Sequence, residues 1–146
     1  MSKPRKRIDS SFLRTLVGYN ARRAALKIMG VFIERMARLE LRPVEFSVLS
    51  LIGHNPGITS REICRELSLL APNLVRLLGR LDQRDLVRRE AHPDDGRAVG
   101  LRLSEAGQAL LAEAEVEAAA LEVEVTPALS DAERAQLIAL LQRVYR

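Results

Sequence analysis

Three side chains between residues 70 and 84 carry groups that can read a base sequence. Asn73, Arg76 and Arg80 follow one another at spacings of three and four residues, which places them on one face of a helix. Amide and guanidinium groups form paired hydrogen bonds with adenine and guanine in the major groove of DNA. Pro72 stands at the start of the same segment. These four residues are candidate DNA contacts, although the same positions would also suit a helix face that only meets water.

The opposite face of this segment is apolar, which predicts a helix packed on a core. A shorter helix precedes it, because Thr59 followed by Glu62 forms a capping box, and that helix ends near Leu67 before a tight turn. Two short helices of which the second presents a polar face are typical of a helix-turn-helix, whose second helix enters the major groove. The leucines of the apolar face recur at i, i+4, i+7, i+8 and i+11: Leu70, Leu74, Leu77, Leu78 and Leu81.

A basic hairpin follows this candidate recognition helix. Residues 86–87 lead into one strand, the HPDDG sequence at 92–96 is a strong turn signal, and residues 98–103 return as a second strand. Arg97 also has a simpler interpretation, which is an ion pair with a neighbouring aspartate. The hairpin carries four further candidate contacts with the DNA backbone or the minor groove: Arg88, Arg89, Asp95 and Arg97.

A long helix must precede this unit. Asp9 or Ser10 can cap a helix over residues 11–39, and its roughly 28 residues would span about 42 Å. One small domain cannot cover a helix of that length, so we expect a partner chain. Apolar residues at both chain ends support a dimer: Phe12, Leu13, Leu16 and Val17 in front, and Leu129, Leu137, Leu140, Leu141 and Val144 behind.

Three more helices are predicted, each from a signal at its start. These signals are Pro43 in the first turn of a helix over 41–52, Ser104 before a helix that ends near Val125, and Ser130 with Glu133 before a final helix.

Charge is unevenly distributed along the 146 residues, whose net charge is +4. Residues 1–7 carry four positive charges and no negative charge, whereas residues 104–146 carry three positive and eight negative charges. A basic front suits a polyanion such as DNA, and the acidic tail cannot be part of that contact.

The residue types do not indicate an enzyme. There is no Ser/His/Asp set, no Gly-rich phosphate loop and no metal-ligand spacing, so no catalytic residue, cofactor or metal is expected. No apolar run reaches the roughly 20 residues that a membrane span needs. The single cysteine, Cys64, cannot form an internal disulfide and is interpreted as a small core residue. We therefore expect a cytoplasmic protein without catalytic activity.

Two stretches of the chain resemble the MarR family of bacterial regulators, and the order of elements matches that family over nearly the whole chain. These stretches are NLVRLLGRLDQRDLVRRE at 73–90 and HPDDGRAVGLRLSEAG at 92–107. The family pattern is a Leu-Val pair after the recognition helix, an Asp-x-Arg wing tip and a Leu-Thr-x-x-Gly helix start. Here the matching residues are Leu86-Val87, Asp95 with Arg97, and Leu103-Ser104 with Gly107.

The chain departs from the family at Asp85, where the family usually has a glycine in the left-handed conformation. Aspartate tolerates that conformation at a cost of very roughly 1 kcal/mol. Gly79, inside the recognition helix, costs about another 1 kcal/mol relative to alanine. It either permits a close approach to the helix backbone or has no special role.

The resemblance implies a mainly α fold with a small β-hairpin wing. It implies an N-terminal arm and dimerisation helix in 1–40, a winged helix-turn-helix in 41–103, and C-terminal dimerisation helices in 104–146. It further implies a homodimeric repressor, whose two-fold symmetry requires a pseudo-palindromic operator in double-stranded DNA. The alternative is a helical, dimeric adaptor that does not bind DNA.

A small-molecule pocket between the dimerisation helices and the winged domain is also implied by the resemblance. Its candidate residues are Tyr19, Arg22, Arg23 and Phe46, with an aromatic acid as the expected effector. Either arginine can hold a carboxylate through paired hydrogen bonds. The alternative is that both arginines face solvent or DNA phosphate.

Overall fold

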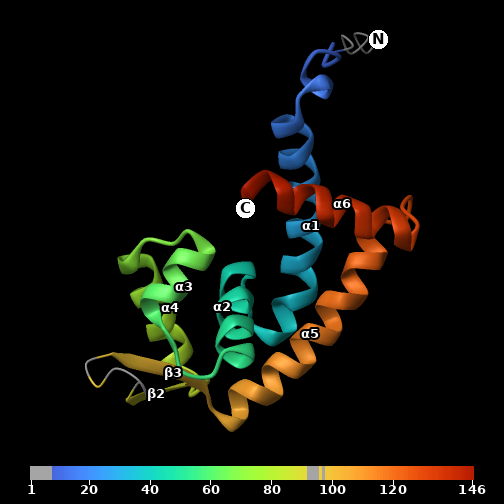
Figure 1. Ribbon diagram of the computed structural model, residues 1–146. Helices are drawn as coiled ribbons and strands as arrows, with labels where there is room; N and C mark the ends of the chain where they lie inside the picture. Colours follow the sequence, from blue (N-terminus) through green and yellow to red (C-terminus); the bar gives the residue numbers. More distant parts are fainter. Residues whose placement is uncertain (1–7, 92–95, 97) are drawn as a thin grey trace, which may run out of the picture.

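The computed structural model describes residues 8–91, 96 and 98–146. Two long helices, α1 (Val17–Met36) and α5 (Glu105–Val125), pack side by side, and a lobe of three shorter helices and a small sheet lies at their lower end (Figure 1). The lobe contains α2 (Pro43–His54), α3 (Ser60–Leu67) and α4 (Ala71–Gln83). The last helix, α6 (Asp131–Tyr145), turns back from the upper end of α5. The predicted fold class, mainly helical with a small wing, is confirmed.

The first helix is shorter than the 11–39 span that the sequence predicts, and this is a correction. A 3-10 turn at Leu13–Thr15 is separated from α1 by Leu16, which is extended at φ −91° and ψ 128°. Local side chains stabilise this break, as polar side chains often compete with the helical ladder. The side-chain amide of Asn20 donates to the carbonyl oxygens of Arg14 and Leu16 at 2.9 and 2.8 Å. The helix α1 therefore has 20 residues and spans about 30 Å.

The helix starts of the lobe agree with the caps in the sequence. Pro43 occupies the first turn of α2. The Thr59 hydroxyl accepts from the Glu62 backbone N–H at 3.3 Å, and the Glu62 carboxylate accepts from the Thr59 backbone N–H at 2.8 Å. Leu70 was expected on the apolar face of α4 but is 71% exposed. It is the N-cap residue of that helix, so its side chain lies outside the helical pattern.

The wing is part of a three-stranded antiparallel sheet in the order β1-β3-β2. Strands β2 (Val87–Ala91) and β3 (Val99–Leu103) pair along their whole length. The sequence did not reveal β1 (Ile58–Thr59), because two residues show no periodicity. The backbone just before β1 approaches β3 closely because the two residues at that point, Gly57 and Gly100, have no side chain. A Cβ on Gly100 would lie 2.9 Å from the carbonyl oxygen of Gly57, which itself has a φ of +93°.

One core joins the lobe to the long helices. Its largest fully buried side chains come from α1, α2, α3, α4, β3 and α5: Met36, Val48, Leu49, Ile52, Ile63, Leu74, Leu81, Leu101 and Leu121. Cys64 is partly buried against this core. Asp85 is left-handed at φ 53°, as expected for the position where the family carries glycine. Its carbonyl oxygen accepts a hydrogen bond from the Ser104 hydroxyl at 2.5 Å.

The chain ends contrast with this core. Ser104 and Ser130 cap α5 and α6 as predicted, yet α6 has no buried residue. The exposed apolar side chains at the two ends include Phe12, Leu13, Leu16 and Val17 in front, and Leu137, Leu140, Leu141 and Val144 on α6.

Among the described residues, none of the helices is long and apolar enough to cross a membrane.

Candidate nucleic-acid interface

The exposed face of α4 brings two of the predicted DNA contacts together. An Nη of Arg76 donates to the amide oxygen of Asn73 at 2.6 Å, and both side chains are exposed. Pro72 is exposed in the first turn of the same helix. The opposite face is fixed by leucines that are at most 3% exposed. The helix therefore holds one stripe in the core and leaves an amide and a guanidinium in contact with each other on its outer side.

Arg80 has a partner inside the protein that the sequence does not show. Its Nε donates to the Glu45 carboxylate at 2.8 Å, and Glu45 is only 5% exposed. The other carboxylate oxygen of Glu45 accepts from the backbone N–H of Arg42 at the start of α2. A buried carboxylate needs such partners because isolated burial of a charge is costly. Arg80 thus links α4 to α2, and the side chain remains 46% exposed.

A groove of about 380 Å³ runs along this side of α4. Its apolar wall comes from Val44 at the start of α2 and from two leucines, and its polar wall is the row Asn73, Arg76 and Arg80. The three predicted polar residues therefore line one continuous concave surface. The signal that could have indicated Arg80's partner is Glu45, the single acidic residue of the mostly apolar α2.

The four residues predicted to contact DNA from the wing do not share one environment. Arg88 is exposed on β2. Arg89 forms an ion pair with Asp82 of α4 at 2.6 Å, so it ties the wing to the recognition helix. Arg97 and Asp95, the predicted wing tip, lie outside the described residues.

The four predicted effector contacts do not converge within one chain. Phe46 packs edge-on against Phe32 of α1, with ring centroids 5.4 Å apart. Tyr19 is thirteen residues before Phe32 on the same helix, a distance of about 20 Å along the axis. Tyr19 is partly buried, and Arg22 and Arg23 are exposed. The effector site stays a prediction.

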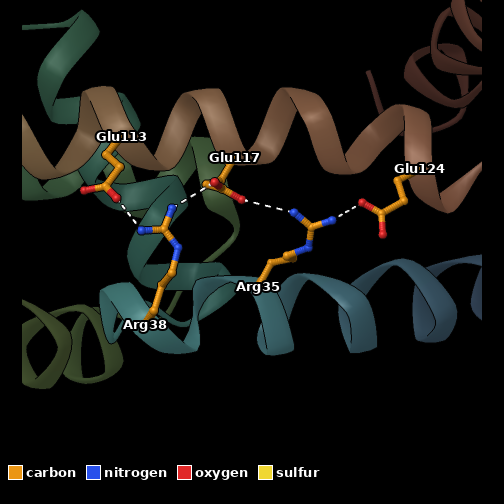
Figure 2. Close-up of polar contacts among 5 residues, drawn as sticks. All are labelled: Arg35, Arg38, Glu113, Glu117 and Glu124. Carbon is orange, nitrogen blue, oxygen red and sulfur yellow. Dashed lines mark hydrogen bonds and ion pairs between the residues drawn. The ribbon is translucent and has the colours of Figure 1, made fainter.

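A charged network joins Arg35 of α1 and Arg38 of the following 3-10 turn to α5 (Figure 2). Arg38 binds Glu113 and also Glu117, the latter at 2.8 Å, while Arg35 binds Glu124 and also Glu117, the latter at 3.4 Å. The hydrogen bond that Arg35 donates to Glu124 is the main cause that raises the pKa of Arg35, and the bond that Arg38 donates to Glu113 is the main cause that raises the pKa of Arg38. The sequence did not reveal this network, although the three glutamates lie on one face of α5 at spacings of four and seven.

A second connection runs from the end of α4 to the end of α1. The Arg84 guanidinium donates to the backbone carbonyl oxygens of Leu39 and Glu40 at 2.9 and 2.8 Å. These carbonyls belong to the 3-10 turn Ala37–Leu39 and its cap, which follow α1 directly. The C-terminal end of the recognition helix is therefore fastened twice, by Arg84 to the turn that follows α1 and by Arg80 to α2.

Comparisons with known proteins agree with this architecture. A family model described as the MarR family matches residues 39–98. The HTH-type transcriptional regulator MhqR of Bacillus subtilis is 30% identical over 104 residues, which cover 71% of this chain and 72% of MhqR.

Two solved structures of the transcriptional repressor CouR resemble the chain along almost its whole length. The complex with a 23-mer DNA duplex has a TM-score of 0.89 and 34% identity, covering 97% of this chain and 100% of that chain. The complex with p-coumaroyl-CoA has a TM-score of 0.84 and 33% identity, covering 96% and 99%. These similarities favour a DNA-binding regulator over the adaptor alternative.

A helix-turn-helix followed by a wing and flanked by two long helices is thus the architecture that this chain shares with regulators of transcription over 96–97% of its length. This protein belongs to the MarR family and is a DNA-binding transcriptional regulator.

Proposed function

We propose that this protein is a homodimeric repressor that places α4 in the major groove of a pseudo-palindromic operator. The observation that carries the proposal is the hydrogen-bonded pair of Asn73 and Arg76 on the exposed face of α4. Asparagine suits adenine and arginine suits guanine, each through two hydrogen bonds. The resemblance to CouR bound to a DNA duplex supports the same docking.

The dimer is supported by apolar surface that one chain leaves uncovered. Phe12 and Val17 are 72% and 70% exposed, and the apolar side chains of α6 are 40% exposed or more. Exposed patches of this kind mark interaction surfaces. A second copy that packs its ends against these ends buries both sets. Two recognition helices can then enter successive major grooves about 34 Å apart.

We further propose that the effector is a coenzyme A thioester of an aromatic acid. The support is the full-length similarity to CouR bound to p-coumaroyl-CoA and the basic side of α1. Arg22, Arg23 and Lys27 are all exposed there. Guanidinium groups bind phosphates through paired hydrogen bonds, so this side suits the phosphates of coenzyme A as well as a free carboxylate.

Selection of bound sequences from a random duplex pool tests the DNA-binding proposal. The selected operator is then used in competition against random duplex. Asn73→Ala and Arg76→Ala should each lose about 1–3 kcal/mol of discrimination per half-site and keep most of the binding to random duplex. Because the two side chains touch, the double variant should lose less than the sum of the single losses.

Lys27→Ala is the matched control, because it removes an exposed positive charge on α1, away from both α4 and α6. It should leave the selected operator bound as tightly as before. If the α4 variants lose equal affinity for the operator and for random duplex, Asn73 and Arg76 contact only phosphates and do not read bases. Selection of no sequence at all would contradict the proposed function.

A further inference from the structure

The exposed face of α4 has an apolar row beside its polar row. Pro72, Val75 and Gly79 follow one another at the same spacings of three and four as Asn73, Arg76 and Arg80, so the two rows run side by side along the helix. We call Pro72, Val75 and Gly79 the apolar row. Val75 is 67% exposed at its centre. A Cβ built on Gly79 meets no atom within 4 Å.

The packing of the chain does not explain Val75. The leucines on the other side of α4 already fix that helix in the core, each at most 3% exposed. A β-branched residue is a poorer helix former than most, and a single exposed apolar side chain is by itself unremarkable on a protein surface. Its position beside the polar row is what points to a role in binding, because Val75 directly precedes Arg76 on the face that presents the Asn73–Arg76 pair.

Val75 also lies on the wing side of that pair. Residue 82 is seven positions further on, so it falls on the same side of the helix, and the Asp82 carboxylate holds Arg89 of β2 at 2.6 Å. The polar row lies on the other side, where Arg80 contacts Glu45. The exposed valine is therefore next to Arg76 and on the same side of α4 as the Asp82–Arg89 ion pair, along the surface that the proposed function turns towards DNA.

We propose that Val75 is a specificity-determining residue that contacts the 5-methyl group of a thymine in each operator half-site, an inference that rests on the proposed function. Thymine presents the only methyl group among the four bases in the major groove, and small apolar side chains are its usual contact. Arg76, the next residue, fixes the register by hydrogen bonding to a neighbouring base. Gly79, one turn further on, leaves the next base pair unobstructed.

The proposal is tested by removing the methyl group from the DNA and its partner from the protein. Full-length protein is titrated with the selected operator and with copies in which one symmetric pair of thymines at a time is replaced by deoxyuridine. Wild-type protein should lose about fourfold in affinity for each methyl group that leaves an apolar contact. One thymine pair, counted over both half-sites, should therefore weaken binding by roughly 15-fold.

Val75→Ala should bind the thymine operator more weakly and should no longer distinguish it from the deoxyuridine operator at that pair. Val75→Thr, which keeps one methyl group, should retain part of the discrimination. Leu70→Ala is the matched control, since Leu70 is also exposed at α4 but lies at its N-cap, off the apolar row. Leu70→Ala should distinguish the thymine operator from the deoxyuridine operator as strongly as wild-type protein does.

The outcomes separate this inference from the proposed function. If wild-type protein selects an operator but no thymine pair shows discrimination, the inference is wrong while DNA recognition stands. The inference is also wrong if Val75→Ala keeps the full discrimination. If wild-type protein selects no operator, the proposed function itself fails. Thermal unfolding of Val75→Ala within a few degrees of wild type confirms that a folded protein was compared.

Discussion

Gly79 is the position on α4 where stability and DNA binding should oppose each other. Glycine inside a helix costs about 1 kcal/mol relative to alanine, and a Cβ here meets no atom within 4 Å. Gly79→Ala should therefore raise the free energy of unfolding by up to about 1 kcal/mol, as measured by chemical denaturation. Because the new methyl group points to the proposed DNA surface, operator affinity should fall by roughly 1 kcal/mol per half-site.

Gly30→Ala provides the comparison for Gly79. Gly30 lies inside α1, and a Cβ there also meets no atom within 4 Å. This variant should gain similar stability and keep the operator affinity. If Gly79→Ala binds the operator as tightly as Gly30→Ala does, the glycine in α4 has no role in the approach to DNA.

At the scale of elements, Glu117 is the shared member of the network between α1 and α5 (Figure 2). Its carboxylate contacts Arg35 and Arg38, and its side chain is 23% exposed. Glu117→Gln removes one charge between two arginines, so it should lower the free energy of unfolding by about 1 kcal/mol or less, because both arginines remain solvent-accessible. The difference from wild type should shrink between low and high salt as screening increases.

Glu122→Gln is the control for Glu117 because it makes the same change at an exposed position of α5. It should leave the unfolding curve unchanged within about 0.5 kcal/mol. A loss for Glu117→Gln that is equal at low and high salt would show that the network stabilises α1 and α5 by packing and not by charge.

At the scale of the whole molecule, assembly should depend on α6. Leu141 is 41% exposed in the single chain, and the proposed dimer buries it. Leu141→Glu places a charge in that apolar contact, so the variant should sediment as a monomer or aggregate and should lose operator binding. Far-UV circular dichroism reports whether the lobe is still folded. A Leu141→Glu dimer with wild-type operator affinity would exclude α6 from the interface.

The effector should act on the spacing of the two lobes. Arg84 and the network around Glu117 fasten the lobe and α5 to α1, so a ligand on α1 can shift the recognition helices without touching DNA. Its effect is limited to its difference in affinity between the two arrangements, and a 100-fold preference supplies about 2.7 kcal/mol. We expect p-coumaroyl-CoA to lower operator affinity, as measured by fluorescence anisotropy.

Arg22→Ala and Arg23→Ala should weaken this release more than they weaken DNA binding without ligand. Free p-coumarate and free coenzyme A, tested in parallel, show which half of the thioester is recognised. Equal release from wild type and both arginine variants would move the effector site away from the basic side of α1. Release by none of the three compounds would contradict the proposed effector class and leave DNA binding untouched.

The sequence by itself determined the elements whose signals are local. The capping pairs Thr59–Glu62 and Ser130–Glu133, Pro43 at the start of α2 and the leucine face of α4 were predicted correctly, because each rests on residues within one or two helical turns. The polar face of α4 followed from the same periodicity. The local break at Leu16 was overlooked, since the apolar spacing continues through it and only the hydrogen bonds of Asn20 reveal it.

Tertiary structure decided the contacts between positions distant in the chain. Glu45 and Arg80 are 35 residues apart, Glu40 and Arg84 are 44 apart, and Arg38 and Glu117 are 79 apart. No periodicity predicts such pairs, because they depend on how α2, α4 and α5 pack against α1. The same packing gave Arg80 a partner inside the protein and left Val75 exposed beside Arg76. A side chain's role on a helix face is set by what the neighbouring elements cover, and a single segment of sequence does not contain that information.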